Sequence, residues 1–239
     1  RLMTGIEKAV YRKPNQKKPM TKYIIRSLIE KYLVADIHSG KTTNIINWRT
    51  VTRMMLEFVT GSRFGEIVSL RPCDISFNDE EMSLFIRKSK TDRIQVGTTK
   101  IVVRDQEHEF LCPVRIAEEY IRRLGYPASS ECSIMPQFRS VQGKSTKARI
   151  STPIQGSVMS HTTASGDLKR ILASIGIDPI DYGEHSGRSG CATEAHAAGA
   201  SIGDIQEKVG WASSAMARHY IQASPEMKKS DLFKISDGM

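Results

Sequence analysis

The feature that most constrains the fold of this chain is a group of polar and aromatic residues in its C-terminal third. His185 and Arg188 stand three positions apart, Trp211 follows 23 positions after Arg188, and Tyr220 lies nine positions beyond Trp211. Residues three apart share one face of a helix, so the imidazole and the guanidinium can reach one ligand. Far upstream, Arg63 adds a second guanidinium in the stretch TGSRFGE. Together these groups can bind a phosphodiester and attack it without a metal ion.

In their order and local spacing, these five residues resemble the active site of the tyrosine recombinase (phage integrase) family, over residues 45–235. The pair Gly210–Trp211 is similar to that of Cre-like members of the family. The resemblance implies a mainly α fold with a small three-stranded antiparallel sheet, the α+β catalytic domain of the DNA breaking-rejoining enzymes. It also implies site-specific recombination of double-stranded DNA, in integration or transposition, through a 3′-phosphotyrosyl intermediate, with no metal, ATP or other cofactor.

Each of the five residues has a role in that chemistry. Tyr220 would be the nucleophile, and because a phenol has a pKa near about 10 it needs a proton acceptor or strongly positive surroundings. Arg63 and Arg188 can each bind two non-bridging phosphate oxygens, a geometry that lysine cannot reproduce. His185 would accept the tyrosine proton or donate a hydrogen bond. Trp211 would donate its indole N–H to a phosphate oxygen.

The general acid is expected on a hairpin between two strands. In the family it is a lysine there, and the segment Arg87–Arg93 occupies that hairpin. Lys90 is the first choice because it stands in a Lys-Thr pair like that of Cre-like members, whereas Lys88 has the spacing to Arg93 of Xer-type members. Glu66 is expected to orient Arg63 or His185, since a carboxylate touching the phosphate would repel it.

Periodicity predicts a helix from Trp48, with Gly61 as its left-handed stop. Strands are expected at 82–86, 93–96 and 100–103, and a loop or insertion between Gly125 and Gly156. Further helices are expected at 113–124, at 168–175, at 185–198, from Ser201 with Asp204 in a capping box, and from Ser213 or Ser214 to Tyr220.

Composition agrees with a nucleic-acid partner. The 239 residues carry 35 Lys and Arg against 26 Asp and Glu, a net charge of +9. A basic balance of this kind is typical of proteins that bind phosphate backbones. The four cysteines form no C-x-x-C pair, which favours a reducing intracellular compartment over a zinc site. No apolar run is long enough to span a membrane. An intracellular protein is expected, nuclear if it comes from a eukaryotic mobile element and otherwise cytoplasmic.

Three regions are expected along the chain. Residues 1–22 are the end of an N-terminal region and a basic, proline-containing linker, and because the sequence opens at Arg1 it is expected to be a piece of a longer protein. Residues 23–223 are the catalytic domain. Residues 224–239 begin with a helix start and carry a short apolar cluster that either folds back or, as the resemblance implies, docks in trans in a homo-tetramer on two recombination sites.

Two other functions are compatible with parts of this pattern. A type IB topoisomerase shares the two arginines, the lysine, the histidine and the tyrosine, but not the Gly-Trp pair. A domesticated DNA-binding protein would be expected to have lost part of the set. The stretch Gly143–Ser145 resembles the end of a P-loop without its first glycine, so nucleotide binding is not expected. Cys112–Val114 and Ser89–Asp92 look similar to recombinases of the eukaryotic Crypton and DIRS elements.

Overall fold

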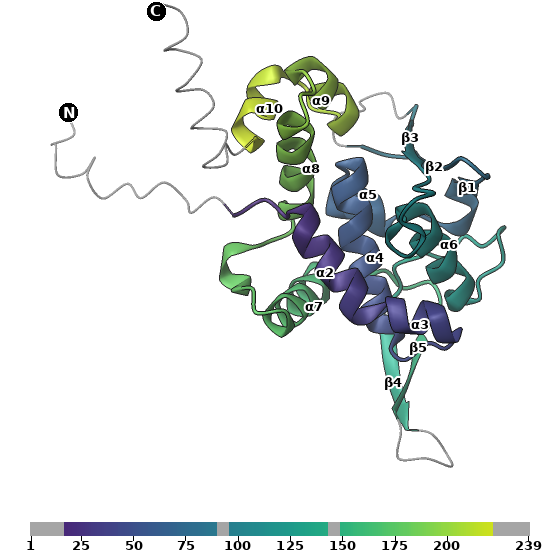
Figure 1. The fold of residues 1–239 in the computed structure, drawn as a ribbon. Coiled ribbons are helices and arrows are strands. Elements are labelled where there is room, and N and C mark those ends of the chain that lie inside the picture. Colours follow the sequence, from purple (N-terminus) through teal and green to yellow (C-terminus); the bar gives the residue numbers. More distant parts are fainter. Residues whose placement is uncertain (1–16, 90–95, 143–148, 222–239) are drawn as a thin grey trace, which may run out of the picture.

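The computed structural model describes residues 17–89, 96–142 and 149–221, which form a helical body with two small antiparallel sheets (Figure 1). The α-helices are α2 (Lys22–Tyr32), α3 (Val34–Ser39), α4 (Ile45–Thr60), α5 (Phe64–Val68), α6 (Pro113–Leu124), α7 (His161–Ser174), α8 (Ser186–Ala197), α9 (Ile202–Val209) and α10 (Ser214–Tyr220). The 3-10 helices are η1 (Pro72–Asp74), η2 (Glu109–Leu111) and η3 (Pro179–Asp181). The strands are β1 (Ile75–Phe77), β2 (Glu81–Ile86), β3 (Thr98–Val103), β4 (Phe138–Gln142) and β5 (Arg149–Pro153).

Helix α4 is the centre of the body and packs against α2, α6, α7 and α8. Its N-cap is Asn44, whose side chain accepts hydrogen bonds from two backbone amides of the first turn. It ends at Gly61, which has a φ of 63° in the left-handed region that favours glycine. Gly61 is therefore the helix stop that the sequence predicted, and the chain leaves α4 directly into the segment that carries Arg63.

Helix α8 lies close to α4 and to the entering chain because two of its residues are glycines. A Cβ atom at Gly187 would lie 2.8 Å from the Cβ of Glu57 on α4. A Cβ atom at Gly190 would lie 2.0 Å from the carbonyl oxygen of Met20, closer than real atoms approach. The amide of Met20 also donates to the carbonyl of Ser186, at 2.8 Å. The start of α8, where Arg188 stands, is thus held on two sides.

The first sheet has the order β1-β2-β3, with antiparallel neighbours. A sheet of three strands was predicted, and the segments at 82–86 and 100–103 lie in β2 and β3. Of the strand predicted at 93–96, only Val96 is described, because residues 93–95 lie outside the described residues. Val96 belongs to no strand, so the prediction was wrong at this residue. The third strand is instead β1, which precedes β2 by a tight turn. With three residues, β1 is too short to produce a recognisable alternation.

The region between Gly125 and Gly156 is not entirely irregular, as the sequence analysis expected, because it contains the hairpin of β4 and β5. The hairpin projects from the helical body (Figure 1). Each of its strands has only five residues, too few for periodicity to reveal it. Helix α7 also begins earlier than the predicted 168, at the N-cap Ser160. Helices α2 and α3 were not predicted.

The helices α8, α9 and α10 gather at one end of the molecule (Figure 1). Their contacts form a second hydrophobic cluster, separate from the main core, that consists of Cys191, Ala192, Ile205, Val209, Trp211 and Ala217. The capping box of Ser201 and Asp204 is present at the start of α9. All three helices were predicted. Trp211 and Tyr220 therefore belong to a part of the protein with its own packing.

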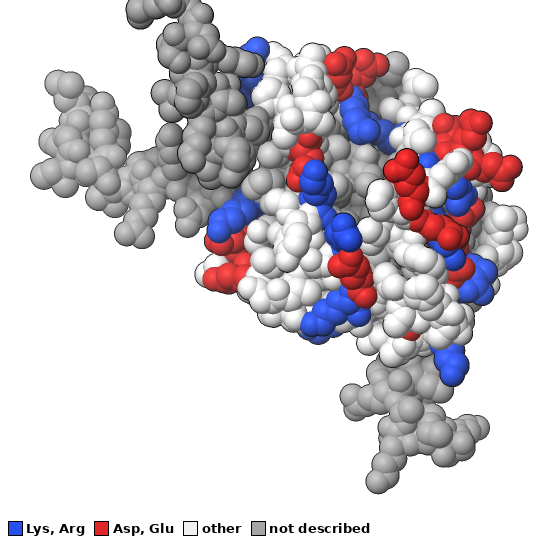
Figure 2. Space-filling view, viewed as in Figure 1, with Lys and Arg blue, Asp and Glu red and all other residues white. Residues whose placement is uncertain are grey.

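Charges of both signs are interspersed on the face shown in Figure 2. The positive excess of the chain is therefore not gathered into one patch on this face. Within the described residues, no helix is long and apolar enough to cross a membrane. All four cysteines are free thiols.

Candidate active site

The structure brings six of the seven predicted site residues to one region around the start of α8. Arg63 stands at the N-cap of α5, and Glu66 lies in the first turn of that helix. His185 is the N-cap of α8 and Arg188 lies in its first turn. The remaining two follow from the C-terminal helices: Trp211 lies between α9 and α10, and Tyr220 is the last residue of α10. Segments more than a hundred residues apart therefore form one site.

Arg63 is held by two side chains. Its Nη1 donates to Oε1 of Glu66 at 2.7 Å and to Oγ of Ser89 at 3.0 Å. The hydroxyl of Ser89 in turn donates to the same Glu66 oxygen at 2.9 Å. The other carboxylate oxygen of Glu66 accepts from the backbone amide of Arg63 at 2.8 Å. Of the two residues that Glu66 was expected to orient, it forms hydrogen bonds with Arg63. The hydrogen bonds among Arg63, Glu66 and Ser89 fix the direction of the Arg63 guanidinium.

Ser89 is a site residue that sequence reasoning missed. It lies at the end of the β2 side of the hairpin, next to the position of the expected general acid. Its contact with Arg63 spans 26 positions of sequence, so no local pattern announces it. Through Ser89, the hairpin is tied directly to Arg63.

Arg188 is a buried cation with unused hydrogen-bonding capacity. Its residue is 2% exposed, and its Nη1 donates to the carbonyl oxygen of Gly61 at 2.5 Å. Its Nη2 has no hydrogen-bond partner among the described residues. Burial, together with the charge of Arg63, lowers the pKa of Arg188 to about 10, so the group is still charged at neutral pH. A buried, charged N–H without a partner is costly, and an anion at this position would remove that cost.

The aromatic side of the site is built around Tyr220. Its ring stacks on that of Trp211, with centroids 5.1 Å apart and planes at 17°. The ring of His185 lies 6.2 Å away at 62°, and that of the neighbouring His219 lies 5.5 Å away at 89°. The hydroxyl of Ser189 donates to the carbonyl oxygen of Tyr220 at 3.0 Å, which ties the end of α10 to α8. Sequence reasoning missed Ser189 as well.

The expected general acid is the one predicted residue that the structure does not place. Lys90 and Arg93 lie outside the described residues. Lys88 is described and exposed, two residues after the end of β2. The choice between Lys90 and Lys88 therefore stays a prediction.

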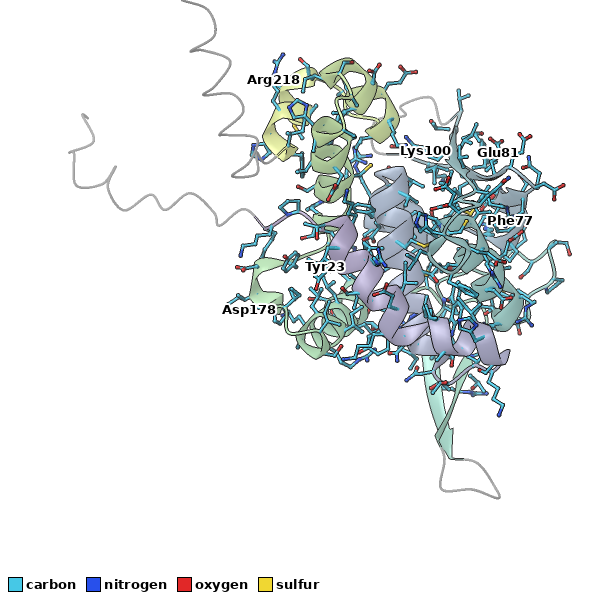
Figure 3. All side chains as sticks on the ribbon, viewed as in Figure 1. Tyr23, Phe77, Glu81, Lys100, Asp178 and Arg218 are labelled. Atoms are coloured by element: carbon cyan, nitrogen blue, oxygen red, sulfur yellow. The ribbon has the colours of Figure 1, made fainter. Side chains whose placement is uncertain are left out.

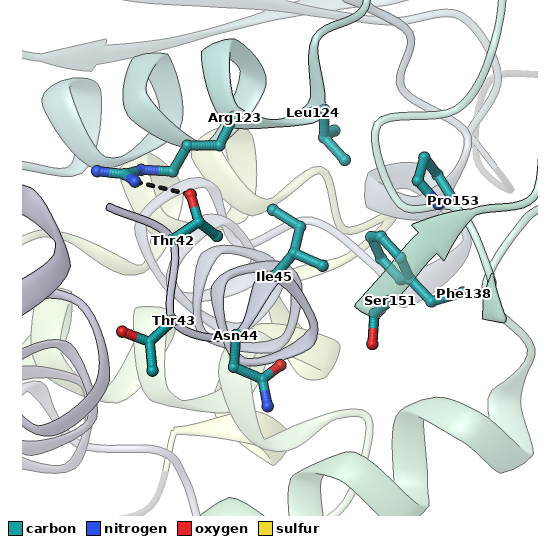
Figure 4. A pocket seen from close by; sticks show the side chains of 9 residues that line it. All are labelled: Thr42, Thr43, Asn44, Ile45, Arg123, Leu124, Phe138, Ser151 and Pro153. Atoms are coloured by element: carbon teal, nitrogen blue, oxygen red, sulfur yellow. Dashed lines mark hydrogen bonds between the residues drawn. The ribbon is translucent and has the colours of Figure 1, made fainter. Parts of the chain in front are cut away.

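Among the described residues, no group of three or more His, Cys, Asp and Glu side chains is arranged to hold a metal ion. A cavity of about 400 Å³ lies between the N-terminus of α4 and the β4–β5 hairpin (Figure 4). Arg123 points there toward Thr42, to which it donates at 2.9 Å. None of the predicted site residues lines this cavity.

Known proteins of one family are similar to this chain in sequence. The sequence model of the Phage integrase family matches residues 29–227. The integrase of Mycobacterium phage L5 is 28% identical over 168 residues, which are 69% of this chain and 41% of that protein. The chain therefore spans less than half of the length of this relative.

Solved structures show the same fold. The XerH site-specific recombinase, bound to a palindromic difH substrate in a post-cleavage complex, aligns with a TM-score of 0.60 at 16% identity, over 93% of this chain and 53% of that one. The XerA recombinase aligns with a TM-score of 0.59 at 17% identity, over 94% of this chain and 65% of that one. The Tn1549 transposon integrase in complex with transposon right end DNA aligns with a TM-score of 0.59 at 11% identity, over 98% of this chain and 70% of that one. The family match covers most of the chain, and the chain belongs to the phage integrase family of tyrosine recombinases.

Proposed function

We propose that this protein is a site-specific DNA recombinase that cleaves and rejoins strands through a covalent phosphotyrosine. The observation that carries the proposal is Arg188, a buried, charged guanidinium whose Nη2 has no partner in the described part of the chain. It lies over the Trp211 ring, on which the Tyr220 ring stacks. A phosphodiester oxygen supplies the missing partner.

In the proposed reaction, the phenol oxygen of Tyr220 attacks the phosphorus of one DNA strand, and the bond from phosphorus to the 5′ oxygen breaks. The tyrosine proton passes to His185, whose ring is next to that of Tyr220. Arg63, directed by Glu66 and Ser89, and Arg188 stabilise the charge that develops on the non-bridging oxygens. Lys90 protonates the leaving 5′ oxygen. Strand joining is the reverse, with an incoming 5′ hydroxyl as nucleophile.

This chemistry uses no ATP, because the phosphotyrosine bond conserves the energy of the phosphodiester that was broken. It uses no metal ion, because the two arginines supply the positive charge at the phosphate. We further propose that the partner is double-stranded DNA, bound by a homo-tetramer on two recombination sites, with residues 224–239 docking between protomers. The relatives bound to DNA in solved structures support the DNA partner. The protein would act wherever its DNA is, in the nucleus of a eukaryotic host or the cytoplasm of a bacterial one.

The experiment does not require a known target sequence. The purified protein is incubated with a library of duplexes that carry a randomised segment and a nick that lets the cleaved end diffuse away. Covalent adducts are isolated under denaturing conditions, and the bound DNA is sequenced. We expect adducts enriched in one sequence from the wild-type protein and none from Tyr220→Phe, which lacks only the attacking oxygen.

Three outcomes would contradict the proposal. An adduct that persists in Tyr220→Phe would remove Tyr220 from its role. Adducts without sequence preference, together with relaxation of supercoiled plasmids that lack the selected site, would identify a type IB topoisomerase activity instead. Binding to the selected DNA without any adduct would identify a DNA-binding protein without catalysis.

A further inference from the structure

Lys100 stands where a sheet normally places an apolar residue. It lies on β3 opposite Leu84 of β2, and Leu84 and the next residue on the same face, Val102, are both buried. Its neighbours on the other face, Ile101 and Val103, are 54% and 72% exposed. Because side chains alternate along a strand, Lys100 occupies the inward face and is only partly exposed. A charged residue at such a position breaks the usual pattern, and breaks of this kind tend to lie at functional positions.

The ammonium group of Lys100 reaches the last turn of α9. Its Nζ donates to the backbone carbonyl oxygen of Lys208. Lys100 itself is labelled in Figure 3. The carbonyls of the last turn of a helix have no partner within the helix, and the helix dipole favours a cation there. Lys208 is two residues before Gly210, which ends α9 in the left-handed conformation with a φ of 78°. Trp211 follows Gly210 directly, so the hydrogen bond from Lys100 is made three residues before Trp211.

Lys100 also lies at the arginine side of the site. A cavity of about 290 Å³ is lined by Glu66 and Ser89, which hold Arg63, and by Lys100, Val209 and Gly210. Burial lowers the pKa of Lys100, while the charge of Glu66 acts in the opposite direction and that of Arg188 adds to the lowering. Lys100 is therefore close enough to Glu66 and to Arg188 for the charges of both residues to act on it.

The residues around the site pack in two separate hydrophobic clusters. Glu66 lies two residues after Phe64, which is part of the main core, whereas Val209, Trp211 and Ala217 are in the second cluster with Tyr220 packed against it. Where the two parts meet, they fit closely: a Cβ atom at Gly61 would lie 2.9 Å from Cγ2 of Val209. The bond from Lys100 to α9 joins the sheet to the part that carries the nucleophile.

We propose that Lys100 is a positioning residue: its bond to the Lys208 carbonyl fixes the end of α9, and thereby sets Trp211 and Tyr220 against Arg188. This inference rests on the proposed recombinase function. Lys100 does not touch the phosphate or move a proton in this role. It decides how often the nucleophile is in place when DNA is bound.

The test compares Lys100→Met, which keeps the length of the side chain and loses the donor, with Lys100→Arg, which keeps a donor. The control is Lys169→Met, at an exposed lysine of α7. Single-turnover adduct formation on a nicked duplex of the selected sequence should fall on the order of 100-fold in Lys100→Met, because a displacement of about 1 Å has that effect on a reacting pair. The Kd for DNA should stay within about threefold, since this salt-dependent affinity comes from many phosphate contacts. Lys100→Arg should recover most of the loss, and Lys169→Met should show none.

Two further measurements separate positioning from other roles. Trp48 is fully buried and donates to Asp36 at 2.8 Å. If acrylamide quenches the tryptophan fluorescence of Lys100→Met more than that of the wild-type protein, the increase should therefore come from Trp211. That added quenching should vanish in Lys100→Met/Trp211→Phe. A 5′-bridging phosphorothioate, whose thiolate leaves without a proton, should not restore cleavage by Lys100→Met.

The outcomes are distinct. Cleavage by Lys100→Met at the wild-type rate, or unchanged Trp211 quenching, overturns the inference. Rescue by the phosphorothioate makes Lys100 a proton donor and overturns it too. If Lys100→Met does not melt cooperatively, Lys100→Gln, which keeps an N–H of shorter reach, takes its place with the same expectations. Absence of an adduct from the wild-type protein would be a failure of the proposed function and not of this inference.

Discussion

The indole ring of Trp211 lies almost parallel to the phenol ring of Tyr220, with centroids 5.1 Å apart. The guanidinium carbon of Arg188 lies over the same indole, 5.1 Å from its centroid. Trp211 therefore contacts both the proposed nucleophile and a proposed phosphate ligand. Its ring sets the separation of these two groups, in addition to any hydrogen bond that its N–H donates.

The two contributions of Trp211 can be separated by substitution. Trp211→Phe keeps an aromatic surface against Tyr220 and loses the N–H donor, whereas Trp211→Ala loses both. We expect single-turnover cleavage to fall on the order of 100-fold in Trp211→Ala, because the nucleophile is no longer held, and clearly less in Trp211→Phe. DNA affinity, measured in parallel, should change little. Equal losses in the two variants would show that the indole N–H alone matters.

The general acid can be identified by chemical rescue. If Lys90 protonates the leaving oxygen, Lys90→Ala should lose about 10²- to 10⁴-fold in cleavage of ordinary DNA and recover on a 5′-bridging phosphorothioate substrate. Arg188→Ala should not recover, because its role is to stabilise charge on the non-bridging oxygens. Recovery of Lys88→Ala in place of Lys90→Ala would move the assignment by two residues.

The buried charge of Arg188 predicts stabilisation by anions. At constant ionic strength, replacing chloride by sulfate should raise the thermal midpoint of the wild-type protein, since a ligand present at ten times its Kd adds about 1.4 kcal/mol to the free energy of unfolding. The effect should be absent in Arg188→Met, whose side chain cannot bind the ion. A similar rise in both proteins would place the bound sulfate elsewhere on the basic surface.

Asp36 predicts how stability responds to acid. Burial raises the pKa of its carboxyl, but hydrogen bonds from Thr43 and Trp48 outweigh burial and lower this pKa below its model-compound value of 3.8. The unfolded state then binds the proton more readily, so the stabilisation is present above pH 3.8 and is lost as the pH falls through the lower folded value. Asp36→Asn should cost about 1–3 kcal/mol at pH 7.

Urea unfolding between pH 3 and pH 7 measures this effect. The difference in the free energy of unfolding between the wild-type protein and Asp36→Asn should shrink as the pH falls below 3.8. A difference that is constant over the whole range would mean that the Asp36 charge adds nothing to the folded state.

The sequence by itself determined the helices whose ends are marked and whose apolar faces repeat. Gly61 stops α4 because a left-handed cap needs no side chain, and the Ser201–Asp204 box starts α9 because these two residues satisfy each other's backbone amides. These signals are local, so they can be read without the fold. The order and spacing of His185, Arg188, Trp211 and Tyr220 identified the family for a similar reason, since a reaction on one phosphate requires these groups in a defined order.

Only the tertiary structure decided how distant segments meet. Ser89 reaches Arg63, Lys100 reaches the end of α9, and the Gly61 carbonyl fixes Arg188, although each pair is separated by at least 26 positions. Strand β1 and the two strands of the β4–β5 hairpin have too few residues to show a recognisable alternation. Such contacts depend on how packed helices and strands bring backbone groups together, and hydrogen bonds of this kind leave no period in the sequence. Arg63 and Arg188 could therefore be named from the sequence, whereas the residues that hold them in place depend on the folded chain.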